Sequence, residues 1–144
     1  MQMFRSPTCR FAAAVAIVGA SASAHRIGGV PVDLLKRLGY AGRILPVNPK
    51  SAEIQGLPAW PTLSAIGEPI DLAIFALPEA ALDSAIDDAI AAGVKTGVVF
   101  TAGYAEVGAE GEAAQRRIAE RAAAAGLRLV GPNCLGVMNL RRGV

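Results

Sequence analysis

Several residue types are scarce in this sequence, and each scarcity argues against a class of protein. Its 144 residues contain two cysteines, Cys9 and Cys134, which lie too far apart for the spacing of a metal site. We expect two reduced thiols in a cytoplasmic protein rather than a disulfide, and we assign no metal ligand. The net charge is only +2, and no run of Lys or Arg forms a patch, so nucleic acid is not expected as a partner. Beyond the N-terminus no apolar run approaches the ~18 residues of a membrane span, so no membrane partner is expected either.

Aromatic residues are also scarce, at 5%, although 53% of the chain is hydrophobic. Small apolar side chains of this kind suit helices that pack closely on a sheet. A chain of this length forms one domain and buries roughly two-thirds of its unfolded surface.

Short apolar runs that stop at turn residues alternate with amphipathic segments. Strands are predicted at residues 14–18, 43–47, 71–77, 97–101 and 128–130. Helices are predicted at residues 28–38, 79–92 and 110–125, each followed by a glycine, with an optional further helix between the second and third strands. This order predicts an α/β fold: a Rossmann-like, doubly wound parallel sheet of about five strands with helices on both faces.

The stretch FAAAVAIVGASASAH, residues 11–25, supports two opposed interpretations. Arg5 and Arg10 precede an apolar run that small residues follow, which is the pattern of a cleaved secretory signal peptide. The same residues also form a buried strand and a glycine-started loop that opens a helix. A doubly wound sheet has later strands on both sides of its first strand, so removal of residues 1–24 would delete the middle of the sheet. We therefore predict that residues 14–19 form a central strand that the mature protein keeps.

Gly19, Ala20 and Ser21 end the first predicted strand and begin a loop of small side chains. Such residues allow a phosphate to approach backbone N–H groups at a helix N-terminus. The G-x-G-x-x-G pattern of dinucleotide loops is absent, because Ser21 stands where its second glycine would be. A plain strand-to-helix turn is therefore the alternative interpretation.

The second predicted strand ends at Asn48-Pro49-Lys50, where NAD-binding sheets carry an acidic residue for the ribose. Lys50 would attract a phosphorylated ribose. Its alternative role is that of a solvated surface lysine, and the spacing favours neither.

Several segments together resemble the CoA-binding domain of NDP-forming acyl-CoA synthetases. These enzymes are the relatives of ADP-forming acetate–CoA ligase and of the succinyl-CoA synthetase α subunit. The resemblance covers residues 14–139, and its most specific part is the G-P-N-C-L-G motif after the last strand. It is carried by residues 15–21, 27–29, 42–50, 53–56, 77–78, 100–104 and 131–136.

The resemblance implies coenzyme A as the ligand and a role for each matched position. The motifs follow strand ends, where a parallel sheet has its ligand crevice. One set would approach the phosphates, a second would hold the adenosine end with its extra phosphate, and a third would line the slot of the pantetheine arm. These sets are, in turn, Gly19, Ala20 and Ser21; Asn48, Pro49 and Lys50; and Leu77, Pro78, Ala102, Gly103, Asn133 and Cys134.

The resemblance also implies domains that this chain lacks. Synthetases of this family convert an acid, CoA and ATP into acyl-CoA, ADP and phosphate. They use a phosphorylated histidine in a second domain and a nucleotide site in an ATP-grasp domain. The single histidine here, His25, lies in the first loop, and we assign no catalytic residue. We expect an N-terminal part of a larger synthetase, inactive alone: a lead-in at residues 1–13, the CoA-binding domain at 14–139 and the entry to a second domain at 140–144.

Three alternatives stay open. A free-standing CoA-binding protein would carry the same motifs. An NAD(P)-binding oxidoreductase domain would place a 2′-phosphate at Lys50 but has no use for the G-P-N-C-L-G segment. Cys134 could accept an acyl group if a base such as His25 stood beside it, or it could be a small residue that shapes the thiol end of the slot.

Overall fold

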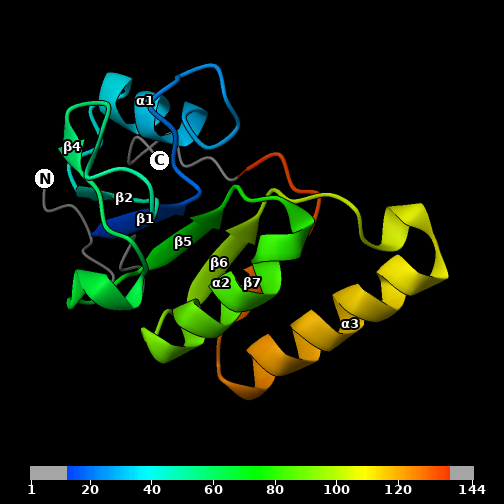
Figure 1. Cartoon of the computed structure of the whole chain (residues 1–144). Coiled ribbons are helices and arrows are strands. Elements are labelled where there is room, and N and C mark those ends of the chain that lie inside the picture. Colours follow the sequence, from blue (N-terminus) through cyan, green and yellow to red (C-terminus); the bar gives the residue numbers. More distant parts are fainter. Residues whose placement is uncertain (1–12, 137–144) are drawn as a thin grey trace, which may run out of the picture.

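Five parallel strands form the sheet on which the helices pack (Figure 1). The computed structural model describes residues 13–136, so Cys9, most of the predicted lead-in and residues 137–144 lie outside it. The strands lie in the order β2-β1-β5-β6-β7, which confirms the predicted doubly wound α/β sheet. Their bounds are β1 Ala14–Val18, β2 Arg43–Val47, β5 Leu72–Phe75, β6 Thr96–Val99 and β7 Arg128–Val130.

Strand β1 pairs with β2 on one side and with β5 on the other, as the sequence predicts. All five of its residues are buried. The chain leaves β1 toward β2 and later returns to the far side of β1 at β5, so the direction of winding reverses between these strands. Open α/β sheets bind ligands outside the carboxyl ends of the strands at this kind of reversal.

Helices cover both faces of the sheet (Figure 1). Helix α1 (Val30–Arg37) packs Val32 and Leu35 with Val15 and Ile17 of β1. Helices α2 (Glu79–Ala91) and α3 (Ala109–Ala124) cover the opposite face, where Ala16 and Val18 of β1 lie in the same core cluster as the helix residues Leu82, Ile86, Ile118 and Ala122. Alternate residues of β1 thus enter separate cores, which is why this strand is a continuous apolar run. No helix within residues 13–136 has the length and apolar character needed to cross a bilayer.

The expectation of a further helix between β2 and β5 is wrong. This part of the chain forms a hairpin of β3 (Glu53–Ile54) and β4 (Leu57–Pro58), followed by a single 3-10 turn at Ser64–Ile66. Gln55 and Gly56, with φ of 52° and 80°, make the two-residue turn of the hairpin. Prolines interrupt the whole segment between β2 and β5 and remove N–H groups that a helix needs. They are Pro49, Pro58, Pro61 and Pro69.

Candidate functional site

The carboxyl ends of β1 and β5 meet at the reversal of the sheet. Gly19 follows β1 directly and has φ of +84°, a conformation that favours glycine. A methyl group on Gly19 would collide with the carbonyl oxygen of Ala76 and would lie 2.8 Å from Leu77 Cδ2. The fold therefore brings two of the predicted site residues, Gly19 and Leu77, into direct contact.

The loop from Gly19 to Gly29 is held against the end of β2. The N–H groups of Gly19 and Ala20 both donate to the carbonyl oxygen of Val47, at 3.0 and 3.2 Å. The loop then folds back on itself, because Ser21 N–H donates to the carbonyl oxygen of Gly28 at 3.2 Å. Gly28 leaves no room for a side chain, since a methyl group there would collide with the carbonyl oxygen of Gly19.

Backbone donors remain in the middle of this loop. Among residues 13–136, the N–H groups of Ala22, Ala24 and His25 form no hydrogen bond. Unpaired N–H groups just before a helix suit an anion such as a phosphate. The loop fits the predicted phosphate site in this respect.

The segment Asn48-Pro49-Lys50 lies beside the loop. The Asn48 side chain donates from Nδ2 to the carbonyl oxygen of Ala20 at 2.9 Å, and its Oδ1 accepts from the backbone N–H of Lys50 at 2.9 Å. Asn48 therefore ties the end of β2 to the loop after β1. Lys50 is exposed, and none of the described carboxylates forms an ion pair with its ammonium group. Its charge is available to an anionic ligand.

Thr101 joins the remaining predicted segments. Its buried Oγ1 donates to the carbonyl oxygen of Leu77 at 2.9 Å, and its own carbonyl oxygen accepts from Asn133 N–H at 2.9 Å. Cys134 N–H donates in turn to the carbonyl oxygen of Val99 at 3.2 Å. The chain segments after β5, β6 and β7 are thus bonded to one another along the same edge of the sheet.

Glu106 fixes the loop that carries Ala102 and Gly103. The carboxylate accepts from Gly103 N–H at 2.7 Å and from Tyr104 N–H at 3.2 Å. The Gly103 hydrogen bond, together with the Glu106 and Tyr104 amides, holds the pKa of Glu106 below its usual value. The loop keeps this shape while Glu106 is ionised.

Cys134 has no activating partner in the described part of the chain. Its Sγ lies 3.4 Å from Gly136 N and 3.5 Å from the Gly136 carbonyl oxygen, and neither group is a base. His25 is exposed in the loop after β1 and makes no hydrogen bond with Cys134. The geometry favours the interpretation of Cys134 as a small, partly buried residue over that of a nucleophile. Within residues 13–136, no three His, Cys, Asp or Glu side chains gather in a way that could hold a metal ion.

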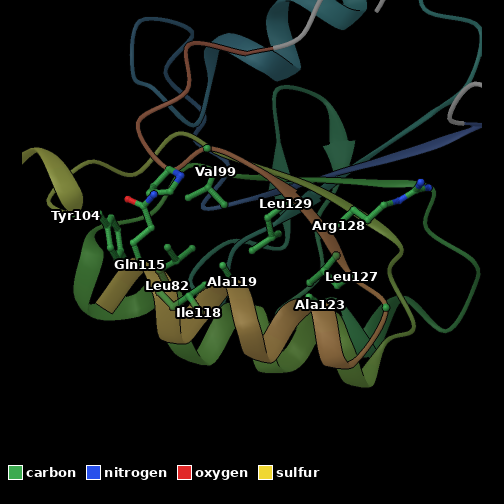
Figure 2. A pocket seen from close by; sticks show the side chains of 13 residues that line it. Leu82, Val99, Tyr104, Gln115, Ile118, Ala119, Ala123, Leu127, Arg128 and Leu129 are labelled. Carbon is green, nitrogen blue, oxygen red and sulfur yellow. The ribbon is translucent and has the colours of Figure 1, made fainter. Parts of the chain in front are cut away.

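A separate concavity of about 550 Å³ lies between the sheet and helices α2 and α3 (Figure 2). Figure 2 shows Tyr104 and Gln115 at one end and Arg128 at the other, with apolar side chains between them. None of the predicted site residues lines it. Its lining includes Leu82, Ile118, Leu127 and Leu129.

Sequence reasoning gave no role to two residues that shape the site. Thr101 and Gln55 both belong to matched segments, and both hold other site segments through their side chains. A polar residue directly after a buried strand was the signal at Thr101. The dipeptide Gln55-Gly56 in a proline-rich segment was a turn signal, but its contact with the loop after β1 depends on the fold.

Comparison with known proteins agrees with the geometry of this edge. Residues 13–139 match a family described as a CoA binding domain. The chain belongs to this family. The match confirms the resemblance and includes every predicted site residue, although the role of each one stays a prediction.

Several similar proteins are larger ligases. Residues of this CoA binding domain are 38% identical to acetate–CoA ligase [ADP-forming] I of Archaeoglobus fulgidus over 87% of this chain and 18% of that protein. They are 34% identical to the α subunit of acetate–CoA ligase [ADP-forming] II of Pyrococcus furiosus, over 87% of this chain and 27% of the subunit. A solved acetyl-coenzyme A synthetase 1 of Ca. Korarchaeum cryptofilum, in complex with phosphate and ADP, superimposes with a TM-score of 0.87 at 34% identity. That alignment covers 92% of this chain and 28% of the synthetase chain, so the chain spans less than a third of each relative.

Proposed function

We propose that this domain binds coenzyme A at the carboxyl edge of its sheet, as the N-terminal part of a cytoplasmic NDP-forming acyl-CoA synthetase. One observation carries the proposal: the segments that match CoA binding domains meet at the winding reversal, beside a loop with unpaired N–H groups. The proposal adds three things to the family membership: the ligand, its binding position on the sheet and the class of enzyme to which the domain belongs.

Each part of coenzyme A has a matching environment at this edge. The pyrophosphate would lie against residues 19–21 and the unpaired N–H groups that follow, close to the N-terminus of α1. The 3′-phosphate of the adenosine end would meet Lys50 next to Asn48 and Pro49. The uncharged pantetheine arm would follow Leu77, Pro78, Ala102 and Gly103 to its thiol end at Asn133 and Cys134.

The domain would supply binding and orientation rather than bond-making. Formation of acyl-CoA from an acid, CoA and ATP needs a phosphoryl carrier and a nucleotide site. We assign both to further domains or to a subunit, as in the larger ligases of this family. His25 is exposed in the loop after β1, and we propose it as a loop residue beside the phosphates rather than as the phosphoryl carrier.

The purified 144-residue chain is expected to bind CoA and to form no acyl-CoA. Side-by-side calorimetric titrations with CoA, NADPH and NAD measure the first point, and ATP-dependent formation of acetyl-CoA measures the second. Tighter binding of NADPH than of CoA would point instead to a dinucleotide-binding oxidoreductase domain. Acetyl-CoA synthesis by the chain alone would contradict the assignment of catalysis to other domains, and would favour a free-standing protein.

The substitution Lys50→Ala is expected to weaken CoA binding and to leave binding of dephospho-CoA almost unchanged. A charge-assisted contact with the 3′-phosphate is worth about 1–3 kcal/mol, which corresponds to a roughly 5- to 150-fold loss of CoA affinity. Dephospho-CoA lacks this phosphate and cannot lose the contact. Raised salt should weaken CoA binding more in the unmodified protein than in the variant, because salt screens the interaction that the variant lacks.

Lys95→Ala provides the matched control for Lys50. Lys95 is also exposed and unpaired among the described residues, but it precedes β6 and so lies at the opposite edge of the sheet. The Lys95→Ala substitution removes the same charge as Lys50→Ala and should change the affinity for neither CoA nor dephospho-CoA. Equal losses for CoA and dephospho-CoA in Lys50→Ala would place Lys50 away from the 3′-phosphate.

A further inference from the structure

The side chain of Gln55, in the turn between β3 and β4, forms hydrogen bonds with the loop after β1. Gln55 Nε2 donates to the carbonyl oxygen of Ser21 at 3.0 Å and to that of Gly29 at 3.0 Å. Both acceptors are carbonyl oxygens, so the NH₂ group, rather than the amide oxygen, must face the loop. One amide group thus bridges the exit from β1 and the entry to α1.

These two hydrogen bonds close the loop around its unpaired donors. Ser21 and Gly29 lie on either side of Ala22, Ala24 and His25, whose N–H groups have no acceptor among residues 13–136. Gln55 holds the Ser21 carbonyl oxygen away from a bound anion, and the Gly29 carbonyl oxygen is held both by Gln55 and by Asp33 N–H in the first turn of α1, at 3.0 Å. The loop can then present N–H groups to a phosphate.

The backbone conformation of Gln55 is unfavourable for its residue type. Gln55 has φ of +52° at the first central position of the hairpin turn, and Gly56 follows with φ of +80°. A two-residue turn with both φ values positive favours Asn-Gly, because asparagine tolerates the left-handed region better than glutamine does. Glutamine is the poorer choice for the turn, but its longer side chain carries the amide to the loop.

The hairpin itself is anchored on its other side. Lys36, in the last turn of α1, donates from Nζ to the backbone carbonyl oxygen of Gln55. Gln55 is therefore fixed through its backbone by α1 while its side chain holds the loop that leads into the same helix. The hairpin, the loop after β1 and helix α1 are therefore connected to one another by hydrogen bonds of Gln55.

We propose that Gln55 is a positioning residue of the CoA phosphate site. It sets the shape of the loop at residues 19–29 and does not itself contact the ligand. This inference rests on the proposed function, because the loop is the predicted phosphate site. It adds a specific residue, from a hairpin that the sequence prediction did not contain, to that site.

Two substitutions separate positioning from a purely structural role. Gln55→Asn suits the turn better but is one methylene too short to bridge both carbonyl oxygens. Gln55→Leu keeps the unfavourable turn and roughly the side-chain size but removes the amide. If Gln55 positions the loop, both variants bind CoA roughly 5- to 20-fold more weakly, as the loss of one or two hydrogen bonds implies. If Gln55 only stabilises the fold, CoA affinity follows thermal stability, and Gln55→Asn binds at least as well as the unmodified chain.

The experiment compares CoA titrations, thermal unfolding and amide hydrogen exchange for the full 144-residue chain and the variants. We expect Gln55→Asn to unfold at or above the midpoint of the unmodified chain, yet to bind CoA more weakly. In both variants without ligand, the hydrogen-bonded amides of Ser21, Arg26 and Gly29 should exchange faster. Asp88→Ala, which removes a side chain of α2 that accepts from the N–H groups of Leu63 and Ser64 before β5, is the matched control and should leave CoA affinity unchanged.

The outcomes distinguish the two proposals. Failure of the unmodified chain to bind CoA would overturn the proposed function and, with it, this inference. Normal CoA binding by the unmodified chain and by Gln55→Asn would overturn the role of Gln55 alone. Weaker binding by Gln55→Leu, with Gln55→Asn unaffected, would likewise assign Gln55 to stability rather than to positioning.

Discussion

A chain that starts at Ser23 or His25, as cleavage of a signal peptide would leave it, is expected to remain unfolded. Strand β1 lies between β2 and β5, so its removal deletes two strand pairings and separates β2 from the rest of the sheet. Val15, Ile17 and Val18 are 0–7% exposed. Burial of one such side chain contributes about 1.5–3 kcal/mol, so their loss removes roughly 5–9 kcal/mol. That is comparable with the whole stability of a domain, about 5–15 kcal/mol.

Circular dichroism and thermal unfolding of the shortened chain would measure this effect. A matched chain that starts at Phe11 keeps β1 complete and should unfold cooperatively. Mass spectrometry of the protein from its native host should find the residues of β1 in the mature chain. Cooperative unfolding of the chain from His25, or a mature start at Ser23 or His25 in cells, would contradict the prediction.

The substitution Gly28→Ala is expected to abolish most CoA binding by moving the loop after β1. The added methyl group would collide with the backbone of Gly19 and would lie 3.4 Å from Ala20 Cα. Backbone atoms cannot rotate away as a side chain can, so the loop or the start of α1 must shift, at a cost of typically about 1–3 kcal/mol. If the shift removes one charge-assisted hydrogen bond to phosphate, CoA affinity falls roughly 10- to 150-fold.

Gly126→Ala separates this loss from a general loss of stability. Gly126 follows α3 with φ of +76°, and a methyl group there would touch nothing within 4 Å. The left-handed backbone makes alanine unfavourable by roughly 1–2 kcal/mol, so the control loses comparable stability. Its CoA affinity should nevertheless match that of the unmodified chain. Calorimetric CoA affinities measured alongside thermal midpoints check both variants, and equal affinities for them would refute a phosphate role for the loop.

The hairpin and the single 3-10 turn between β2 and β5 belong to a segment whose secondary structure could not be predicted from the local sequence pattern. Residues 48–70 contain scattered apolar side chains with no helical or strand period over a useful length. A two-residue turn at Gln55-Gly56 is less typical than Asn-Gly, so the hairpin signal was weak. The optional helix filled a gap that the topology did not require to be helical.

The strands of the main sheet, the helices on its faces and the family membership were determined by the sequence itself. Buried parallel strands such as β1 and β5 need apolar residues on both faces, and α2 needs apolar residues along one stripe. Both requirements can be recognised from residues that are close together in the sequence. The motif at residues 131–136 is also local, because cysteine, asparagine and the two glycines around a turn are adjacent in the chain. The G-P-N-C-L-G pattern could therefore be read directly.

Only the tertiary structure decided how the site is held. The strand order brings Gly19 against Ala76, residues far apart in the sequence. The Gln55 side chain donates hydrogen bonds to carbonyl oxygens of residues 34 and 26 positions away in the sequence. The Asn48 side chain donates one to a carbonyl oxygen 28 positions away. Backbone carbonyl oxygens are the same in every residue type, so no sequence pattern marks which one will accept such a hydrogen bond. Packing of the hairpin and of α1 against the sheet makes that choice.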